Sequence, residues 1–319
     1  MARAPRPSLE DQLAQLRAME RDEAPVELEV VRAALRGKIG VLVAAAARVV
    51  GATGLTALVD ELGPAFTRLA ERGVERDAGC RGKTAIARAL HQLERWDDAV
   101  FPVGIRLTQP EPVWGGREDT AAELRGVCAM AYAHGYRPDV LDVLADLLAD
   151  PERGARAAAA TALGDAGHPD AAALLRYKVR IGDPEPEVLS ACLGSLLALA
   201  PEGALPLVAE QLEQGDDRAA AAALALGEAR RPGAAALLIG WCDRTTAAMR
   251  ARVGYPALAM LRDAAATDHL LAQVATAGKT DALAAVAALA PYATDPRLAE
   301  RLRAQCAASA EPAVRAAAP

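Results

Sequence analysis

A sequence motif that recurs along the chain is the feature that most constrains its fold. In the copy at 150–176, Asp150 and Pro151 precede an alanine-rich run, Gly164 and Gly167 follow that run, and a second apolar run comes next. Aspartate is a favoured helix N-cap, proline fits the first helical turn, and glycine is typical of helix ends. Each copy therefore predicts two helices joined by a short turn, with Asp150 as the N-cap here.

Equivalent positions in the copies show a regular spacing. These positions are Lys83, Arg125, Arg156, Leu189, Ala219 and Arg250, and successive members are 42, 31, 33, 30 and 31 residues apart. Such a period indicates one helical hairpin per repeat. A hairpin cannot bury its apolar face alone, so neighbouring hairpins stack into a continuous core. The sequence predicts an all-α protein, an α-solenoid of roughly eight or nine antiparallel helical hairpins.

The composition agrees with closely packed helices. The chain is 52% hydrophobic but 3% aromatic, and alanine, leucine and valine supply most of the apolar residues. Alanine has the highest helix propensity, and this high-alanine composition is of a bacterial type. We expect an N-terminal capping helix in 1–24, less regular repeats in 25–103, and regular repeats with a C-terminal cap in 117–319.

One segment, 104–116, interrupts the repeat pattern where the spacing is longest. It contains two prolines, three glycines and Trp114, so we predict an insertion loop and no regular helix there. Insertions in repeat proteins map to loops, often on a binding face. Two interpretations of Trp114 stay open: it packs into the gap that the insertion leaves between repeats, or it is an exposed anchor for a partner.

The phrases at 124–132, 155–164 and 220–227 resemble HEAT repeats, in the short form also found in bilin lyases of the light-harvesting antenna. The resemblance covers most of the chain and is clearest from about residue 117 to 300. It implies a right-handed solenoid whose second helices line the concave face. It does not specify a function, because such repeats serve many unrelated tasks.

The resemblance also gives the basic residues of the repeat two interpretations. It implies that the side chains of Lys83, Arg125, Arg156 and Arg250 point toward the concave side, where they could bind a ligand. HEAT repeats also stack arginine against aspartate of neighbouring repeats as a structural ladder, and Asp119 and Asp150 are available for this. The candidate partner-binding residues are therefore Lys83, Arg88, Trp114, Arg117, Arg125, Arg156 and Arg250.

No catalytic, cofactor-binding or metal-binding residues are predicted. The four histidines, His91, His134, His168 and His269, are scattered without a second ligand at metal-binding spacing. Gly82-Lys83-Thr84 is interpreted as a helix start, because no strand precedes it as a phosphate loop requires. The stripe of Arg88, His91 and Arg95 is interpreted as a solvated helix face. Cys128 and Cys192 lie in apolar runs and are predicted to be small buried hydrophobes.

These features favour a non-enzymatic scaffold that binds a protein or peptide through its concave face and the loop around Trp114. HEAT-like DNA glycosylases that excise alkylated purines provide one alternative, for which Trp96, Trp114, Trp241, Arg88, Arg125 and Arg250 could supply parts. A net charge of -6 and the few aromatics disfavour nucleic acid. A second alternative is an accessory subunit of a larger, bilin-lyase-like complex.

Without a signal peptide or membrane span, we expect a soluble cytoplasmic protein with no small-molecule cofactor.

Overall fold

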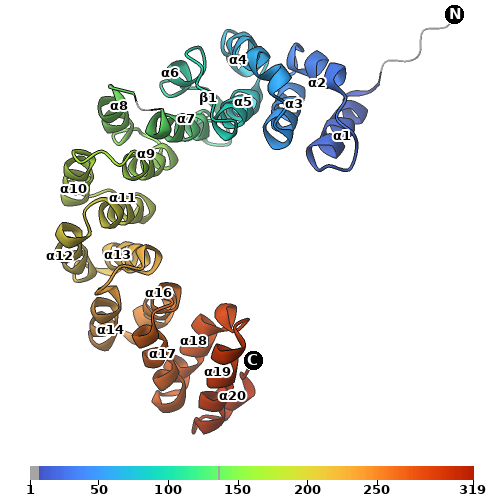
Figure 1. The fold of residues 1–319 in the computed structure, drawn as a ribbon. Coiled ribbons are helices and arrows are strands. Elements are labelled where there is room, and N and C mark those ends of the chain that lie inside the picture. Colours follow the sequence, from blue (N-terminus) through green and yellow to red (C-terminus); the bar gives the residue numbers. More distant parts are fainter. Residues whose placement is uncertain (1–6, 136) are drawn as a thin grey trace, which may run out of the picture. The chain divides into compact units, whose positions relative to one another are not determined.

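The computed structural model describes residues 7–135 and 137–319, and the described part is helical apart from one short β-hairpin. Contacts within the chain divide it into two units, Met1–Ala166 and Gly167–Pro319. In both units, consecutive helix pairs pack on one another (Figure 1). The fold is therefore an α-solenoid, as the repeat pattern predicts.

In the first unit, alternate helices form two layers. Helices α1, α3, α5, α7 and α9 pack on one another in succession, while α2, α4, α6 and α8 each pack against the following helix of that layer. The bounds are α1 (Leu9–Glu20), α2 (Leu28–Leu35), α3 (Gly40–Thr53), α4 (Leu62–Ala70), α5 (Arg81–Gln92), α6 (Phe101–Gly104), α7 (Ala122–His134), α8 (Val140–Leu147) and α9 (Arg153–Asp165), with 3-10 helices at Thr56–Glu61, Gly73–Glu75 and Ala78–Cys80.

The second unit has the same arrangement of helix pairs. Helices α11, α13, α16, α18 and α20 pack in succession, and α10, α12, α14, α17 and α19 are their partners. The described residues of the two units form nine such pairs, in agreement with the predicted eight or nine. The bounds are α10 (Ala171–Ile181), α11 (Pro186–Leu199), α12 (Pro201–Leu212), α13 (Asp216–Ala229), α14 (Ala234–Arg244), α15 (Ala247–Met249), a π-helix (Arg250–Gly254), α16 (Tyr255–Leu261), α17 (Ala264–Thr276), α18 (Lys279–Leu289), a 3-10 helix (Ala290–Tyr292), α19 (Pro296–Ala308) and α20 (Pro312–Ala316).

Helix α1 shows how the local sequence starts an element. The Ser8 side chain accepts a hydrogen bond from Asp11 N at 3.1 Å, and the Asp11 carboxylate accepts one from Ser8 N at 3.1 Å. This capping box satisfies two backbone donors that a helix start leaves unpaired. Leu16 and Met19 then turn inward and are buried, so α1 covers one end of the layer that continues with α3.

The predicted N-cap at Asp150 is wrong. Helix α9 begins at Arg153, after Glu152 as its N-cap. The Asp150 carboxylate is engaged elsewhere, because it accepts hydrogen bonds from Arg125 and from Glu152 N, the latter at 2.8 Å. It therefore stabilises the turn before the helix. The helical spacing itself holds, since Ala155, Ala159 and Leu163 are all fully buried.

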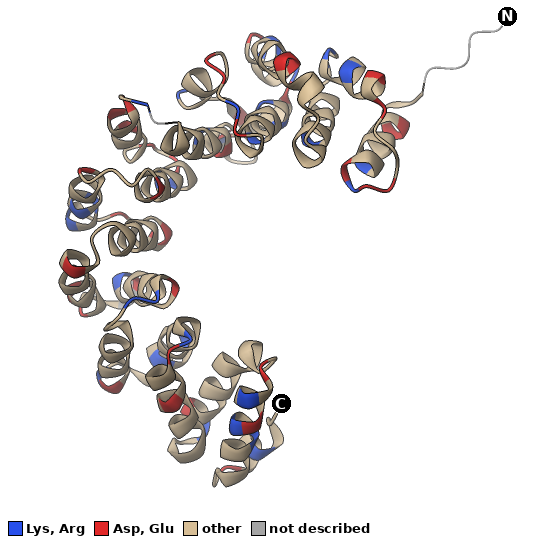
Figure 2. Cartoon of the chain, in the orientation of Figure 1, with Lys and Arg blue, Asp and Glu red and all other residues tan. Residues whose placement is uncertain are grey.

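Charged residues of both signs occur along the helices of both units (Figure 2). In the second unit, exposed ion pairs join successive repeats, for example Arg180 with Glu210 and Arg244 with Glu213. Such exposed pairs contribute about 0–1 kcal/mol each, so the buried apolar layer provides most of the stability. No helix formed by the described residues has the length and apolar character needed to cross a membrane.

Candidate functional site

The segment 104–116, predicted to be a loop, contributes to a β-hairpin. Strands β1 (Pro110–Val113) and β2 (Gly116–Asp119) pair antiparallel, with Val113 opposite Gly116. Trp114 and Gly115 form the two-residue turn, and Gly115 has a φ of 87°. A tight hairpin turn needs such a positive φ, which glycine adopts without steric cost. The prolines and glycines therefore form a short, defined hairpin that carries Trp114 at its tip.

Hydrogen bonds that are buried or half-buried fix the base of the hairpin. Glu111 Oε1 accepts from Gly79 N and from Thr120 Oγ1, both at 2.7 Å, and from Gln109 Nε2 at 2.8 Å. The hydrogen bond from Thr120 lowers the pKa of Glu111, and those from Gln109 and Gly79 add to it against the effect of burial. Gln109 Nε2 also donates to Asp77 O at 2.8 Å. The hairpin is thus tied to the chain just before α5.

Trp114 is fully exposed at the tip of this anchored hairpin. Its relative accessibility is 104%, so the interpretation in which it fills a gap between repeats is wrong. Val113 beside it is 45% exposed, and Arg117 on β2 is also exposed, with Nη2 3.4 Å from Pro110 O. Burying an exposed tryptophan against a partner releases more free energy than burying a polar side chain, because the indole removes a large apolar surface from water.

Lys83 lies inside the repeat core and not on a solvent-exposed face. Its side chain is 0% exposed, and Nζ donates to Asp77 Oδ2 at 2.8 Å. The Asp77 carboxylate also accepts from Gly82 N at 2.7 Å and from Lys83 N at 3.1 Å, so it caps α5. A buried lysine requires such a partner, because an unpaired buried charge is strongly destabilising.

Arg125 joins two successive repeats in the same way. Its guanidinium makes a bidentate contact with Asp150, at 2.7 and 2.9 Å, and donates to Asp119 Oδ2 at 2.7 Å and to Leu107 O at 2.9 Å. The Arg125 side chain is 2% exposed. Burial by itself would raise the pKa of Asp119, but hydrogen bonds from Gln109, Ala121 and Arg125 outweigh burial and hold this pKa below its usual value.

Arg156 and Arg250 continue the pattern. Arg156 is 9% exposed and donates through Nη1 to Asp150 O at 2.8 Å and to Pro151 O at 2.9 Å. Arg250, in the second unit, pairs with Asp281 at 2.8 Å and donates to Thr245 O at 3.2 Å. The interpretation in which the basic series binds a ligand is wrong for Lys83 and Arg125, because both side chains are buried. Their contacts favour the structural ladder.

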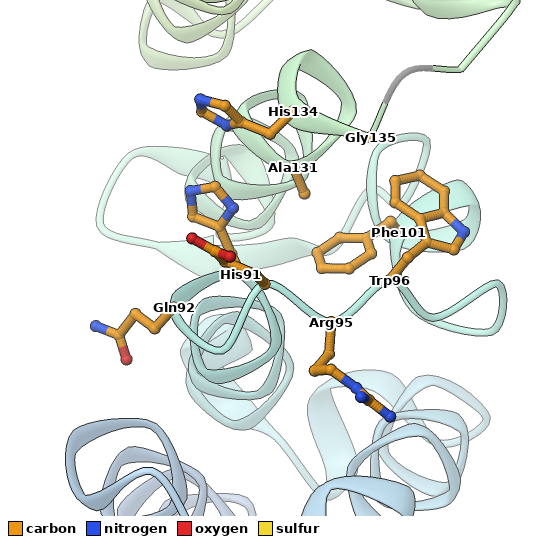
Figure 3. A pocket seen from close by; sticks show the side chains of 9 residues that line it. His91, Gln92, Arg95, Trp96, Phe101, Ala131, His134 and Gly135 are labelled. Atoms are coloured by element: carbon orange, nitrogen blue, oxygen red, sulfur yellow. The ribbon is translucent and has the colours of Figure 1, made fainter. Parts of the chain in front are cut away.

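A pocket of about 580 Å³ lies in the first unit where α5 and α7 end. Figure 3 shows His91 and His134 on one side of it and Phe101 and Trp96 on the other. The two imidazole centroids are 5.5 Å apart. His134 Nδ1 lies 2.9 Å from Met130 O and therefore donates to it. Burial, together with His134, lowers the pKa of His91.

Two tryptophans proposed for a base-binding groove are engaged within the protein. Trp96 packs against Phe101 and Tyr132, each with ring centroids 5.1 Å away, and the Arg137 guanidinium lies 5.1 Å from its ring. Trp241 is 3% exposed in the core of the second unit. Neither indole is free to stack on a nucleobase as single-strand and base-flipping sites require. Of the three tryptophans, Trp114 alone presents its face to solvent.

Comparison with known proteins finds a family match for part of this chain. Residues 115–179, which run from the hairpin turn to α10, match the HEAT repeats family. A search of solved structures found, among other chains, one in the complex of CpcE and CpcF of phycocyanin lyase from Nostoc sp. PCC7120, with 18% identity, a TM-score of 0.37, and coverage of 88% of this chain and 96% of that chain. A search of curated proteins gave no match.

The ladder of basic residues has a further member that the sequence pattern did not reveal. Arg315 in α20 donates through Nη1 to Ser309 O at 2.7 Å and to Ala310 O at 3.0 Å, the same relative positions that Arg156 contacts. The sequence spacing could have revealed Arg315, because it follows Asp281 by one repeat length and stands six residues after Ser309 in the preceding turn. An arginine therefore holds the turn before its helix in both repeats, Arg156 in one and Arg315 in the other.

The pair formed by His91 and His134 was also missed, although the spacing of the repeats contains it. His91 follows Lys83 by eight residues and His134 follows Arg125 by nine, so both occupy the last turn of a second helix in adjacent repeats. The predicted solvated helix face is right for the exposed Arg88. It is wrong for His91, which is half-buried, and for Arg95, which is exposed but lies beyond the end of α5. Searching within one helix cannot reveal contacts between successive repeats.

The five cysteines are buried and unpaired, including Cys128 and Cys192 as predicted. Burial raises the pKa of Cys80 and of Cys192 to about 12, so these thiols stay protonated at neutral pH. Among the described residues, no group of three or more His, Cys, Asp or Glu side chains is arranged to hold a metal ion.

Proposed function

We propose that this chain is a HEAT-repeat scaffold that binds a protein or peptide partner through the β1–β2 hairpin, with Trp114 as the principal anchor, and that this role is not enzymatic. The observation that carries the proposal is the complete exposure of Trp114 at the tip of a hairpin whose base is hydrogen-bonded to the repeat core. Tryptophan is the residue type most enriched among interface hot spots.

The anchoring of the hairpin supports a binding role. A side chain on a mobile loop loses conformational entropy when a partner fixes it, and that cost reduces affinity. Here Glu111 and Gln109 hold the base of the hairpin before any partner arrives. Burying the indole of Trp114 would then give its full hydrophobic gain, about 2–3 kcal/mol at roughly 25 cal/mol per Å² of apolar surface.

The surface beside the hairpin completes the proposed interface. The hairpin base contacts Gly79, immediately before α5, so a partner on Trp114 also meets the layer formed by α1, α3, α5 and α7. In the resemblance to HEAT repeats, this layer of second helices lines the concave face. Arg88 on α5 is 54% exposed and lies on this layer, and the exposed Arg117 lies on the hairpin itself.

A capture experiment with matched variants tests the proposal. Wild-type chain, Trp114→Ala and Tyr177→Ala are immobilised and exposed to extract of the source cells, and captured proteins are quantified by mass spectrometry. Tyr177 is a matched control, because it is 66% exposed on α10 in the second unit. We expect a specific protein to be lost with Trp114→Ala and retained with Tyr177→Ala. Equal recovery by all three baits would contradict the role of Trp114.

A further inference from the structure

A groove walled by arginines crosses α1, α3 and α5 in the first unit. Its volume is about 340 Å³, within the range of roughly 300–1,000 Å³ that ligand pockets occupy. The floor is apolar and includes Leu13, Val41 and Ala85. The walls carry four arginine side chains, all of them exposed: Arg17, Arg48, Arg81 and Arg88.

The central parts of α3 and α5 are buried except at one arginine each. Between positions 42 and 50 of α3, every residue is buried except Arg48, and between 82 and 90 of α5, every residue is buried except Arg88. Because α3 packs on α1 and on α5, the arginines of successive helices project from one surface of the layer. An exposed arginine at the same face of neighbouring helices concentrates positive charge there.

The charge in the groove is only partly compensated. Arg48 pairs with Glu20 at 3.2 Å, and Arg88 pairs with Glu123. Both pairs are exposed, so each contributes about 0–1 kcal/mol and can exchange its carboxylate for that of a partner. Arg17 and Arg81 form no ion pair with any residue that the structure describes.

We propose that this groove binds an acidic peptide segment, whose carboxylates pair with the four arginines while an aliphatic side chain between them contacts the apolar floor. The inference rests on the proposed function and names the partner that the hairpin site would recognise. Gly79 connects the two surfaces, because it lines the groove and donates to Glu111 of β1. Guanidinium groups favour carboxylates through bidentate hydrogen bonds, so the chemistry of the walls and floor matches such a segment.

The surrounding charge favours a short acidic segment over a nucleic acid. Residues 1–166 contain 21 Lys and Arg against 25 Asp and Glu, so the unit that carries the groove is acidic outside it. A nucleic acid would extend beyond the groove, and its phosphates would meet this acidic surface. A segment of a few residues stays within the positive region.

Fluorescence anisotropy with a defined peptide tests the inference. The probe is a fluorescein-labelled peptide of Glu-Glu-Leu triplets, with a Gln-Gln-Leu peptide of the same length as its control. The double variant Arg17→Ser/Arg81→Ser removes the two unpaired arginines. Arg297→Ser/Arg303→Ser removes the same charge from exposed positions on α19 in the second unit. Circular dichroism spectra and melts verify that both variants fold.

We expect the acidic peptide to bind the wild type and the α19 control equally, and to bind Arg17→Ser/Arg81→Ser about fivefold more weakly or worse. The glutamine peptide should not bind, and affinity should fall as salt screens the arginines. Equal affinity of wild type and groove variant would overturn the inference. So would tighter binding of a labelled DNA duplex than of the peptide, with the same loss in the groove variant.

The same variants separate this inference from the proposed function. If the partner captured by wild-type chain is lost with Trp114→Ala but retained by Arg17→Ser/Arg81→Ser, the hairpin role stands and the groove role fails. If Trp114→Ala captures the partner normally while the groove variant loses both the partner and the acidic peptide, the groove role stands and the hairpin role fails.

Discussion

Replacing Arg125 with leucine tests whether the basic series of the repeat is structural. The wild-type guanidinium donates to Asp119, Asp150 and Leu107 O and is 2% exposed, whereas the two carboxylates are 13% and 10% exposed. Arg125→Leu leaves two like charges close together in a site with little water. Removing one partner of a buried ion pair costs about 3–5 kcal/mol. Because both carboxylates keep slight access to water, we expect a loss of about 3 kcal/mol.

Urea unfolding of Arg125→Leu measures this loss. With an m-value of about 2–3 kcal/mol per M, the midpoint for the first unit should fall by roughly 1 M or more. Arg301→Leu is the matched control, because Arg301 also pairs with an aspartate of another helix, Asp268 at 2.5 Å, but its side chain is 52% exposed. That control should lose at most about 1 kcal/mol.

Salt gives a second readout of the same comparison. Screening removes the contribution of an exposed pair and largely spares a buried one, so the loss in Arg125→Leu should persist in 1 M NaCl while that in Arg301→Leu should disappear. If both variants shift the midpoint equally and both effects vanish in salt, the Arg125 contacts are not a buried structural ladder and the reasoning fails.

Two further predictions concern titrating groups in the core. Burial and the neighbouring His134 lower the pKa of His91, so the unfolded state binds a proton first as pH falls below about 6.5. The folded state therefore loses stability from about pH 6.5 downward, and His91→Gln should lessen this loss in thermal melts; melts with identical pH dependence would contradict it. With a pKa of about 12, the buried Cys80 thiol should resist iodoacetamide in the native chain, as should the other four cysteines, and react after unfolding in urea. Stoichiometric labelling of native protein, detected by mass spectrometry, would disprove the burial of the thiols.

The repeat pattern predicts helices and their pairing because local signals agree with stacking. Alanine runs, turn glycines and the spacing of the basic residues all point to helical hairpins, and the structure confirms them. The resemblance to HEAT repeats, and not the pattern by itself, implies a ladder for which Asp119 and Asp150 are available. It cannot show whether Arg125 is buried, because a side chain on a second helix can project into the next repeat or into solvent.

The site depends on contacts that no single repeat encodes. The hairpin forms because Glu111 and Gln109 find partners at Gly79 and Asp77, about 30 residues earlier in the chain, and nothing in a Pro/Gly-rich segment specifies these partners. The exposure of Trp114 follows from that pairing. His91 and His134 likewise meet because α5 packs on α7. Sequence spacing can suggest such meetings once the repeat register is known.

Site-specific photocrosslinking tests the central claim, that the hairpin tip is a partner-binding surface, most directly. The photoreactive residue p-benzoylphenylalanine is placed at Trp114 in one chain and at Tyr177 in another, and cells that express each chain are irradiated. Both positions are exposed aromatics, on the hairpin and on α10 respectively. A discrete crosslinked protein from the Trp114 position and none from the Tyr177 position is the predicted result. No adduct at Trp114, or the same adducts from both positions, would contradict the claim.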